Sequence, residues 1–137
     1  RRSSDLYLIP KGPIVTVQTR KGRNSVYMSR GDHSLIPLVV LINGNSASAS
    51  EIIAGAVQDT KSGIIVGTKS YGKGTVQSVV QGLDEEGLKI TIARYHTPND
   101  RVIDGIGIIP DEIVEPSKAN PEEDVQLERA IEIVKTL

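Results

Sequence analysis

The sequence has 137 residues, a length that suits one domain with a core of its own better than two domains. Its core must be aliphatic, because there is no Phe or Trp and only four Tyr. A formal net charge of −1 gives no electrostatic reason to expect binding to nucleic acid or to an anionic membrane. No apolar run reaches the roughly 18 residues of a membrane span. The absence of cysteine excludes disulfides and cysteine-ligated metals.

The first half of the chain predicts a hairpin followed by a strand–helix–strand unit. Residues 13–19 alternate apolar and polar side chains and predict a strand, and residues 25–29 predict its returning partner. Residues 37–42 form a continuous apolar run, typical of a strand buried on both faces. Residues 50–59 predict a short helix rich in small side chains, and residues 63–67 a second buried strand. Tight connections favour a parallel strand pair and an α/β fold.

The second half predicts a further hairpin, a loop region and a final helix. Residues 76–80 and 88–95 are the expected hairpin strands, and the many Gly and Pro of residues 98–118 indicate loops. We expect an amphipathic helix to begin at Pro121 and all 137 residues to form a single domain. The apolar stripe expected on that helix consists of Leu127, Ile131, Val134 and Leu137.

A turn of small residues, 43–51, joins the first buried strand to the first helix and presents Ser48. A serine hydroxyl held there would lie near the backbone N–H groups of a helix N-terminus. Those groups can stabilise the oxyanion of a tetrahedral intermediate, which makes Ser48 a candidate nucleophile. The same residues also fit a capping box, with Ser48 as N-cap and Glu51 reaching back to it. These residues by themselves leave both interpretations open.

A serine nucleophile needs a general base, and three residues are candidates. No sequence position suggests a carboxylate that would orient His33 or His96, so both are interpreted as solvated loop residues. Lys73 lies between two glycines and has no acidic residue within ten positions. A lysine works as a base only in its neutral form, which requires a desolvated site away from carboxylates. A lysine on an exposed turn is the alternative interpretation.

Gln77 lies four residues after Lys73, a spacing that places both side chains on the same side of a helix or a strand. A neutral amide could orient the lysine by accepting a hydrogen bond without adding a negative charge. On a straight strand the two Cα atoms would be about 13 Å apart. We therefore expect the backbone to bend near Gly74.

Motifs across roughly residues 7–116 resemble the C-terminal processing (tail-specific) serine proteases. This resemblance implies that Ser48 is the nucleophile, that Lys73 is the base, and that Gln77 orients it. It also implies an α/β fold of the ClpP/crotonase-like kind, truncated at its N-terminal side in this chain. His96 stands where the family usually has an aromatic residue. The matching segments are S-A-S-A-S-E-I at 46–52, Y-G-K-G-T-V-Q at 71–77, L-K-I-T-I-A-R-Y at 88–95 and G-I-G-I-I-P-D at 105–111.

The activity that the resemblance implies is hydrolysis of extended or unfolded polypeptides near their C-termini, through a Ser48 acyl-enzyme. It needs no metal or organic cofactor, and the expected compartment is extracytoplasmic, such as the bacterial cell envelope or periplasm. The resemblance further implies an upstream PDZ domain and an upstream glycine-rich segment that supplies an oxyanion donor. Within this chain only the amide of Ala49 is a candidate donor. Because loss of one donor costs roughly 10²- to 10³-fold in rate, we expect the fragment to cleave poorly or not at all.

Other motifs favour other functions. Residues 67–73 fit a phosphate-binding loop, but Gly74 stands where Ser or Thr would bind magnesium. Residues 70–73 fit the S-x-x-K motif of penicillin-recognising enzymes, which lies on a helix that these glycines disfavour. Residues 30–32 match the integrin-binding tripeptide R-G-D, a short motif that is common by chance. The main competitor is a non-catalytic interaction domain of the same fold, whose exposed strand edges pair with another chain or a second copy.

Overall fold

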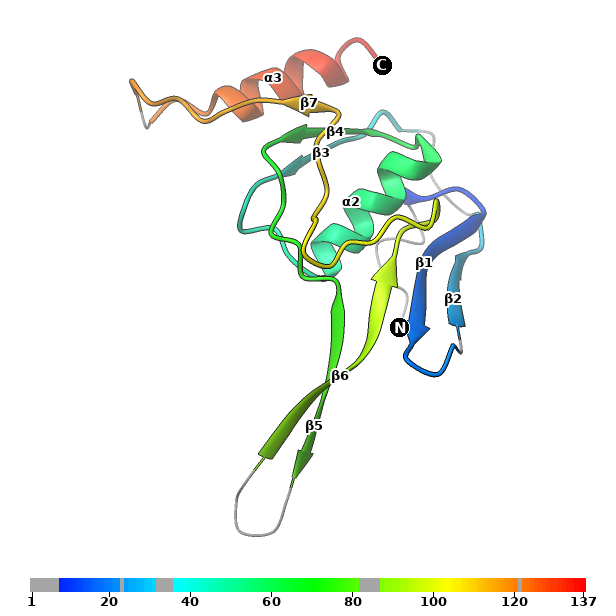
Figure 1. The fold of residues 1–137 in the computed structure, drawn as a ribbon. Coiled ribbons are helices and arrows are strands. Elements are labelled where there is room, and N and C mark those ends of the chain that lie inside the picture. The colour runs from blue at the N-terminus through cyan, green and yellow to red at the C-terminus, as the bar shows by residue number, and fades with distance from the viewer. Residues whose placement is uncertain (1–7, 23, 32–35, 82–86, 121) are drawn as a thin grey trace.

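A computed structural model describes residues 8–22, 24–31, 36–81, 87–120 and 122–137 (Figure 1). The described strands form a four-stranded sheet in the order β2-β1-β6-β5 and a three-stranded sheet in the order β3-β4-β7. The elements are β1 (Gly12–Thr19), β2 (Asn24–Ser29), β3 (Val39–Ile42), α2 (Ala49–Thr60), β4 (Ile64–Gly67), β5 (Thr75–Gln81), β6 (Gly87–His96), β7 (Glu112–Ile113) and α3 (Val125–Val134).

The three-stranded sheet contains the predicted strand–helix–strand unit. β3 and β4 pair in parallel, from Val39 opposite Ile64 to Ile42 opposite Gly67. Helix α2 joins them and lies on one side of the pair, while α3 packs against β3 and β4 on the other (Figure 1). This layering confirms the α/β fold class. Full burial of the first strand was a wrong expectation, because β3 is an edge strand and Leu41 is 42% exposed.

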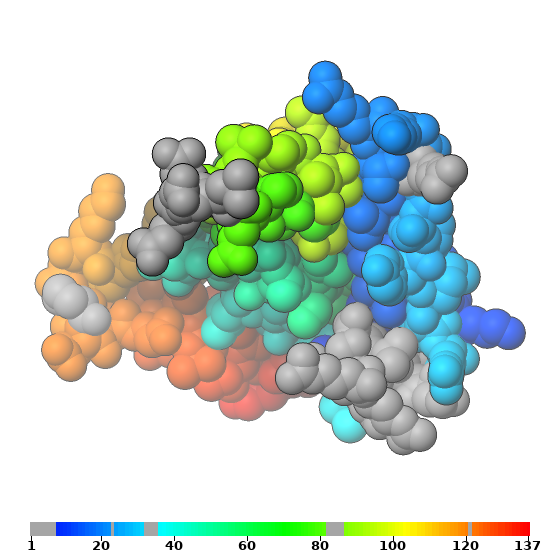
Figure 2. All heavy atoms as spheres, turned by 90° about the horizontal axis from the view of Figure 1, so that it is seen from below, coloured from blue at the N-terminus to red at the C-terminus, as the bar shows by residue number. Residues whose placement is uncertain are grey.

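The four-stranded sheet is built from the two predicted hairpins. β1 pairs antiparallel with β2 and with β6, and β6 pairs antiparallel with β5. The β5–β6 hairpin is strongly twisted and extends away from the body of the molecule (Figure 1). Figure 2 views the molecule from the side of this hairpin, with β1 and β2 in blue beside it and α3 in orange and red behind it. The loop prediction for residues 98–118 holds except for β7, which pairs in parallel with β4.

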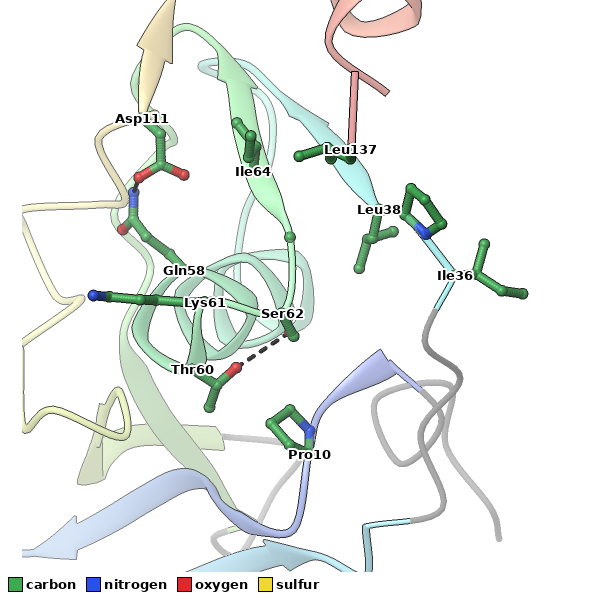
Figure 3. A pocket seen from close by; sticks show the side chains of 12 residues that line it. Pro10, Ile36, Leu38, Gln58, Thr60, Lys61, Ser62, Ile64, Asp111 and Leu137 are labelled. Atoms are coloured by element: carbon green, nitrogen blue, oxygen red, sulfur yellow. Dashed lines mark hydrogen bonds between the residues drawn. The ribbon is translucent and has the colours of Figure 1, made fainter. Parts of the chain in front are cut away.

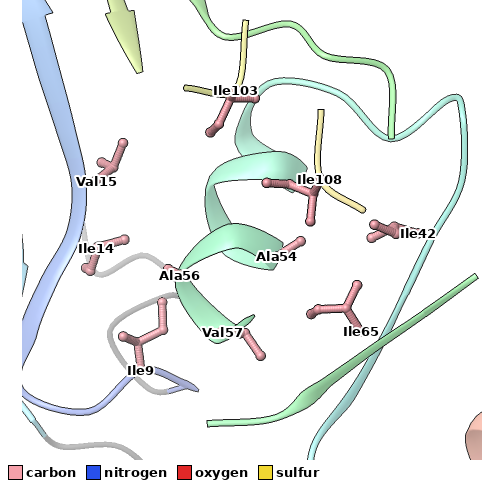
Figure 4. Packing of buried hydrophobic residues seen from close by; sticks show 10 residues of the cluster. All are labelled: Ile9, Ile14, Val15, Ile42, Ala54, Ala56, Val57, Ile65, Ile103 and Ile108. Carbon is pink, nitrogen blue, oxygen red and sulfur yellow. The ribbon is translucent and has the colours of Figure 1, made fainter. Parts of the chain in front are cut away.

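The core is aliphatic, as the composition predicts, and it surrounds α2 (Figure 4). Small residues on the helix let both sheets approach it closely, because Ala54 and Ala56 are fully buried. Burial of each large aliphatic side chain contributes roughly 1.5–3 kcal/mol. The buried cluster consists of Ile9, Ile14, Val15, Ile42, Ala54, Ala56, Val57, Ile65, Ile103 and Ile108.

Helix α3 differs from the prediction in its start and in its buried face. It begins at Val125, because the side chain of Asp124 accepts a hydrogen bond from the Leu127 N–H at 3.0 Å and caps the helix. Pro121, where the helix was expected to begin, lies outside the described residues. The buried residues are Ala130 and Ile133. The expected stripe faces partly outward, with Leu127, Ile131 and Leu137 exposed by 45%, 42% and 57%.

In the described part of the chain, no helix has both the length and the apolar character that crossing a bilayer requires.

Candidate active site

Ser48 occupies a strained turn between the parallel sheet and α2. It is the N-cap residue of α2, with φ of 57° and ψ of −110°, and its side chain is half-buried. A positive φ at a residue other than glycine costs of order 1–3 kcal/mol, and such strain is often found at functional sites. In α/β-hydrolases a sharp, strained strand-to-helix turn holds the nucleophilic serine out of the sheet. The backbone of Ser48 therefore suits a nucleophile as well as a helix cap.

The amide of Ala49 follows directly after this turn. Ala49 is the first residue of α2, and within the described residues its N–H donates to no protein acceptor. The amides of the first helical turn have no partner within the helix and lie at the positive end of its dipole. The next amides are engaged, since Ser50 N–H donates to Ala47 O at 3.3 Å and Glu51 N–H to Ser48 O at 3.0 Å. Ala49 is thus a free donor beside the serine.

Glu51 is the fully buried residue that joins the serine turn to the lysine loop. Its Oε2 accepts hydrogen bonds from the Ser48 N–H at 2.9 Å and the Lys73 N–H at 2.8 Å. Its Oε1 accepts from the Gly72 N–H and from the Ser70 hydroxyl, both at 2.6 Å. Four donors compensate the burial of this carboxylate, which would otherwise be costly. One side chain therefore fixes the backbone positions of both Ser48 and Lys73.

Sequence reasoning assigned Glu51 only a capping role. The half of the capping box in which the glutamate accepts from the N-cap amide is present. The S-x-x-E pattern in the sequence predicts only one of the four hydrogen bonds to Glu51, the one from the Ser48 N–H. The other three donors come from residues 70–73. Lys73 has no acidic residue within ten positions, yet a carboxylate binds its backbone N–H. This carboxylate belongs to Glu51 on α2, an element separate from the loop that carries Lys73.

The two glycines around Lys73 let its loop pack tightly against residues 103–107. Gly72 has φ of 91°, and the Gly105 N–H donates to its carbonyl at 2.9 Å. A Cβ atom on Gly74 would lie 2.3 Å from the backbone nitrogen of Asp104. The Lys73 backbone is thereby held in place, but its side chain is exposed. Among the described residues, no hydrogen bond joins it to the Ser48 hydroxyl and no carboxylate lies within ion-pair distance.

Gln77 lies on β5, beyond an irregularity in the strand pairing between Val76 and Gln77. Bulges of this kind bend the strand that carries them, so the bend expected near Gly74 remains a prediction to which this irregularity, two residues further along, could contribute. Lys73 and Gln77 line the same open groove, which has a volume of about 520 Å³. We call it the β5 groove; its polar lining consists of Asn45, Tyr71, Lys73, Thr75, Gln77 and Lys89.

His96 differs from the prediction in two respects. It is only 8% exposed, at the end of β6, and its Nδ1 lies 2.8 Å from Asp100 Oδ1. The chain turns back there, with φ of 61° at Asp100, and supplies the orienting carboxylate that sequence spacing did not suggest. Its Nε2 is buried and has no hydrogen-bond partner among the described atoms, so no serine is placed to use it as a base. His33 lies outside the described residues, as does Asp32 of the R-G-D motif.

The two competing motifs around Lys73 do not adopt the structures that their functions need. Residues 68–74 are not helical, and the Ser70 hydroxyl is buried, donates to Glu51 and accepts from the Ile108 N–H at 2.7 Å. This geometry excludes the S-x-x-K arrangement. A strand, β5, follows Gly74 where a phosphate-binding loop would lead into a helix. The structure thus opposes the NTPase interpretation as well.

A larger hollow of about 610 Å³ lies at the other end of α2, away from Ser48 (Figure 3). Asp111, at its edge, has a structural role: its Oδ1 accepts from Gln58 Nε2 and its Oδ2 from the Ile65 N–H, both at 2.8 Å. These bonds hold the G-I-I-P-D segment against α2 and β4. Apolar side chains such as Ile36, Leu38 and Leu137 line much of the hollow. Its described hydroxyls, Thr60 and Ser62, lie within hydrogen-bond distance of each other at 3.2 Å, and no hydrogen bond between described residues joins either to Lys61.

Comparisons with known proteins identify the family of the chain. The chain is 38% identical over 132 residues to a carboxyl-terminal-processing protease of Synechocystis sp., covering 92% of the chain and 31% of that protein. It is 45% identical over 108 residues to a carboxy-terminal-processing protease of Bartonella bacilliformis, covering 77% of the chain and 25% of that protein. The chain thus spans about a third or less of these relatives.

Solved structures give the same result. The photosystem II D1 C-terminal processing protease is similar with a TM-score of 0.77 at 36% identity, over 95% of this chain and 33% of that one. The tricorn protease, at 16% identity and a TM-score of 0.59, shares the fold alone. Residues 4–114 match the family described as Peptidase family S41. The chain is therefore a member of peptidase family S41.

Proposed function

We propose that this chain carries the nucleophile and the base of a serine peptidase that cleaves extended or unfolded polypeptides near their C-termini. The observation that carries the proposal is the shared carboxylate of Glu51, which binds the backbone amides of Ser48 and Lys73 at 2.9 and 2.8 Å. A serine on a strained helix cap and a lysine on a glycine-flanked loop are thus anchored to the same buried group. The names of the C-terminal processing relatives support the same substrate class.

In this mechanism the Ser48 Oγ attacks the peptide carbonyl carbon while the neutral Lys73 amine accepts the hydroxyl proton. The negative oxygen of the tetrahedral intermediate accepts a hydrogen bond from the free Ala49 N–H. As the C–N bond breaks, Lys73 returns the proton to the leaving amine, which leaves an acyl group on Ser48. Water then attacks the acyl carbon while Lys73 takes its proton, and Lys73 passes that proton to the Ser48 Oγ as the ester C–O bond breaks, which restores the starting state. Gln77, on the same groove as Lys73, orients the amine through its side-chain carbonyl.

The exposed position of Lys73 decides how active this chain can be alone. A lysine works as a base only in its neutral, desolvated form, so a base role requires further protein or substrate to cover the β5 groove. Only one oxyanion donor, Ala49, is identified within the described residues. We therefore propose that the isolated 137-residue chain cleaves peptides poorly, and that the activity belongs to the intact protein that contains it.

The test of this function is site-specific labelling and cleavage in the intact protein. A fluorophosphonate probe should modify Ser48, and Ser48→Ala should reduce kcat/KM for an extended peptide by at least about 10³-fold. Ser50→Ala, two residues further on and exposed, is the matched control and should leave both readouts near wild type. Full cleavage by the Ser48→Ala protein would refute the proposal, and labelling at Ser50 would assign a different nucleophile.

His96 provides an independent control for the choice of base. His96→Phe replaces the imidazole, with its buried, unpartnered Nε2, by the kind of hydrocarbon ring that the family resemblance implies at this position. We expect this variant to retain peptidase activity within about threefold, whereas Lys73→Ala should lose at least about 10³-fold. A loss in His96→Phe as large as that in Lys73→Ala, in a variant that unfolds like wild type, would make histidine the base.

No metal, nucleic acid or cofactor enters this mechanism, so we expect cleavage to persist in excess EDTA. The partners that we propose for the protein are polypeptide substrates and the protein segments that complete the β5 groove. One relative carries the name C-terminal processing peptidase, chloroplastic. We propose an extracytoplasmic compartment for this protein, which fractionation of the source cells with an antibody against the chain would test.

A further inference from the structure

The β5 groove carries more positive charge than the proposed chemistry requires. Two lysines line it, Lys73 and Lys89, together with hydroxyl and amide side chains. Its described lining contains no carboxylate. The mechanism uses Lys73 but gives no role to Lys89. The ammonium group of Lys89, in a described lining without a carboxylate, makes the groove complementary to a ligand that carries negative charge.

The register of the hairpin places Lys89 on the same face as Gln77. Lys89 pairs with Val79 and Thr91 pairs with Gln77, so Lys89 is the diagonal neighbour of Gln77 across the two strands. Diagonal neighbours on one face of an antiparallel pair are about 7–8 Å apart. The side chain of Lys89 is exposed and forms no ion pair with any described carboxylate. Within the described residues, its ammonium group is therefore available to a ligand in the groove.

The groove runs along a strand that can accept an extended peptide. β5 is the last strand in the order β2-β1-β6-β5, so its outer edge is not paired with a described strand. Extended peptides bind such edges by adding a strand, with main-chain hydrogen bonds giving affinity and side-chain contacts giving specificity. Lys73 lies two residues before β5 begins, and from Thr75 to Val79, the partner of Lys89, the strand advances four residues, or about 13 Å.

We propose that Lys89 is a carboxylate-binding subsite of this groove. It selects peptides with a negative group, an Asp or Glu side chain or the terminal carboxylate, about four to six residues from the cleaved bond, since an extended peptide advances about 3.3 Å per residue. The inference rests on the proposed function for the position of the cleaved bond. The contact is partly exposed to solvent, so its effect on affinity is about three- to tenfold and weakens with salt.

The experiment measures peptide binding to the intact Ser48→Ala protein by fluorescence anisotropy, so it does not depend on turnover. Three labelled peptides share one sequence. The first is neutral with a C-terminal amide, the second has one Glu at the position of interest with an amide end, and the third has a free terminal carboxylate there. We expect the Glu peptide, the peptide with the free terminal carboxylate, or both, to bind about three- to tenfold more tightly than the neutral peptide at low salt. The two acidic peptides distinguish a side-chain carboxylate from a terminal one.

Variants at Lys89 then assign the preference. Lys89→Gln should abolish the preference for acidic peptides, and Lys89→Arg should preserve it. Lys69→Gln makes the same charge change outside the groove and should leave the preference intact. Equal binding of all three peptides, or an unchanged preference in Lys89→Gln, would overturn the subsite. If Ser48 proves not to be the nucleophile but this preference is lost in Lys89→Gln, the proposed function fails while the subsite stands.

Discussion

The start of α2 and the β5–β6 hairpin are stabilised in opposite ways. At the start of α2, the buried carboxylate of Glu51 satisfies four donors and fixes two loops. Along the hairpin, Val79, Val80 and Leu88 are 65%, 52% and 61% exposed. The first region depends on a fully satisfied buried network, and the second has apolar surface that nothing in the described structure covers. Substitutions should therefore be costly in the first region and mild in the second.

The largest effect is expected for Glu51→Gln. The amide group presents N–H donors where one carboxylate oxygen accepts two hydrogen bonds, so buried donors face donors. We expect the free energy of unfolding to fall by about 2–5 kcal/mol, measured by urea denaturation, together with a loss of Ser48 labelling. Glu115→Gln, an exposed residue, is the control and should change stability by less than about 0.5 kcal/mol. Equal stability of the two variants would mean that the network is not what holds this region.

Gly74→Ala tests the packing of the lysine loop. Its Cβ atom would lie 2.3 Å from the Asp104 nitrogen, so a backbone segment must move. We expect a loss of about 1–3 kcal/mol in the free energy of unfolding and a fall in peptidase activity of the intact protein. Gly87→Ala, where the nearest atom is a Val79 methyl at 3.7 Å, should be close to neutral. The same loss in both variants would point to a general effect of alanine rather than to this contact.

The hairpin provides the contrasting case. Leu88→Thr removes an exposed apolar side chain, so the isolated chain should change its free energy of unfolding by less than about 0.5 kcal/mol. We propose that this surface pairs with another protein segment or a second copy, which exposed apolar strands favour. Sedimentation velocity should then show self-association of the wild type that weakens in Leu88→Thr. A wild type that stays monomeric at high concentration would remove the second copy as the partner.

The smallest effect concerns the exposed link between β7 and α3. The hydrogen bond from Arg129 lowers the pKa of Glu112, and the positive charge of Arg129 acts in the same direction. A lowered pKa means that the pair stabilises the fold above the unfolded pKa of about 4.3 and loses this contribution as the pH falls through the folded value. Arg129→Gln should slightly lower the urea midpoint at pH 7 and flatten its acid dependence. Lys118→Gln should leave both unchanged, and an identical acid profile in Arg129→Gln would contradict the assignment.

Periodicity and local motifs predicted much of the fold, and for a physical reason. The strands, α2 and the serine turn follow from alternation, small residues and capping within a few positions of each other. The start of α3 was missed because Asp124 caps the helix after the proline that was expected to begin it. Its buried face was misjudged because burial depends on how the helix lies against β3 and β4.

The features of the site that sequence did not predict depend on contacts between separate elements or on a reversal of the chain. Glu51 receives donors from residues 19–22 positions away, and no pattern within α2 reports them. Asp100 reaches His96 only because the chain reverses at a residue with positive φ. The family resemblance supplied the candidate roles of Ser48 and Lys73, but it did not indicate what holds the two loops together.

The most direct measurement is a crystal structure of the intact protein, with a peptide bound to the Lys73→Ala variant and, separately, the wild-type apo state. We predict that Lys73 Nζ of the wild type lies within about 3.2 Å of the Ser48 Oγ, shielded from water, with the Glu51 hydrogen bonds unchanged. The peptide carbonyl should lie beside the Ala49 N–H. Two results together would contradict this prediction: a Lys73 side chain that points into solvent in the wild-type structure, and a peptide bound away from Ser48 in the Lys73→Ala structure.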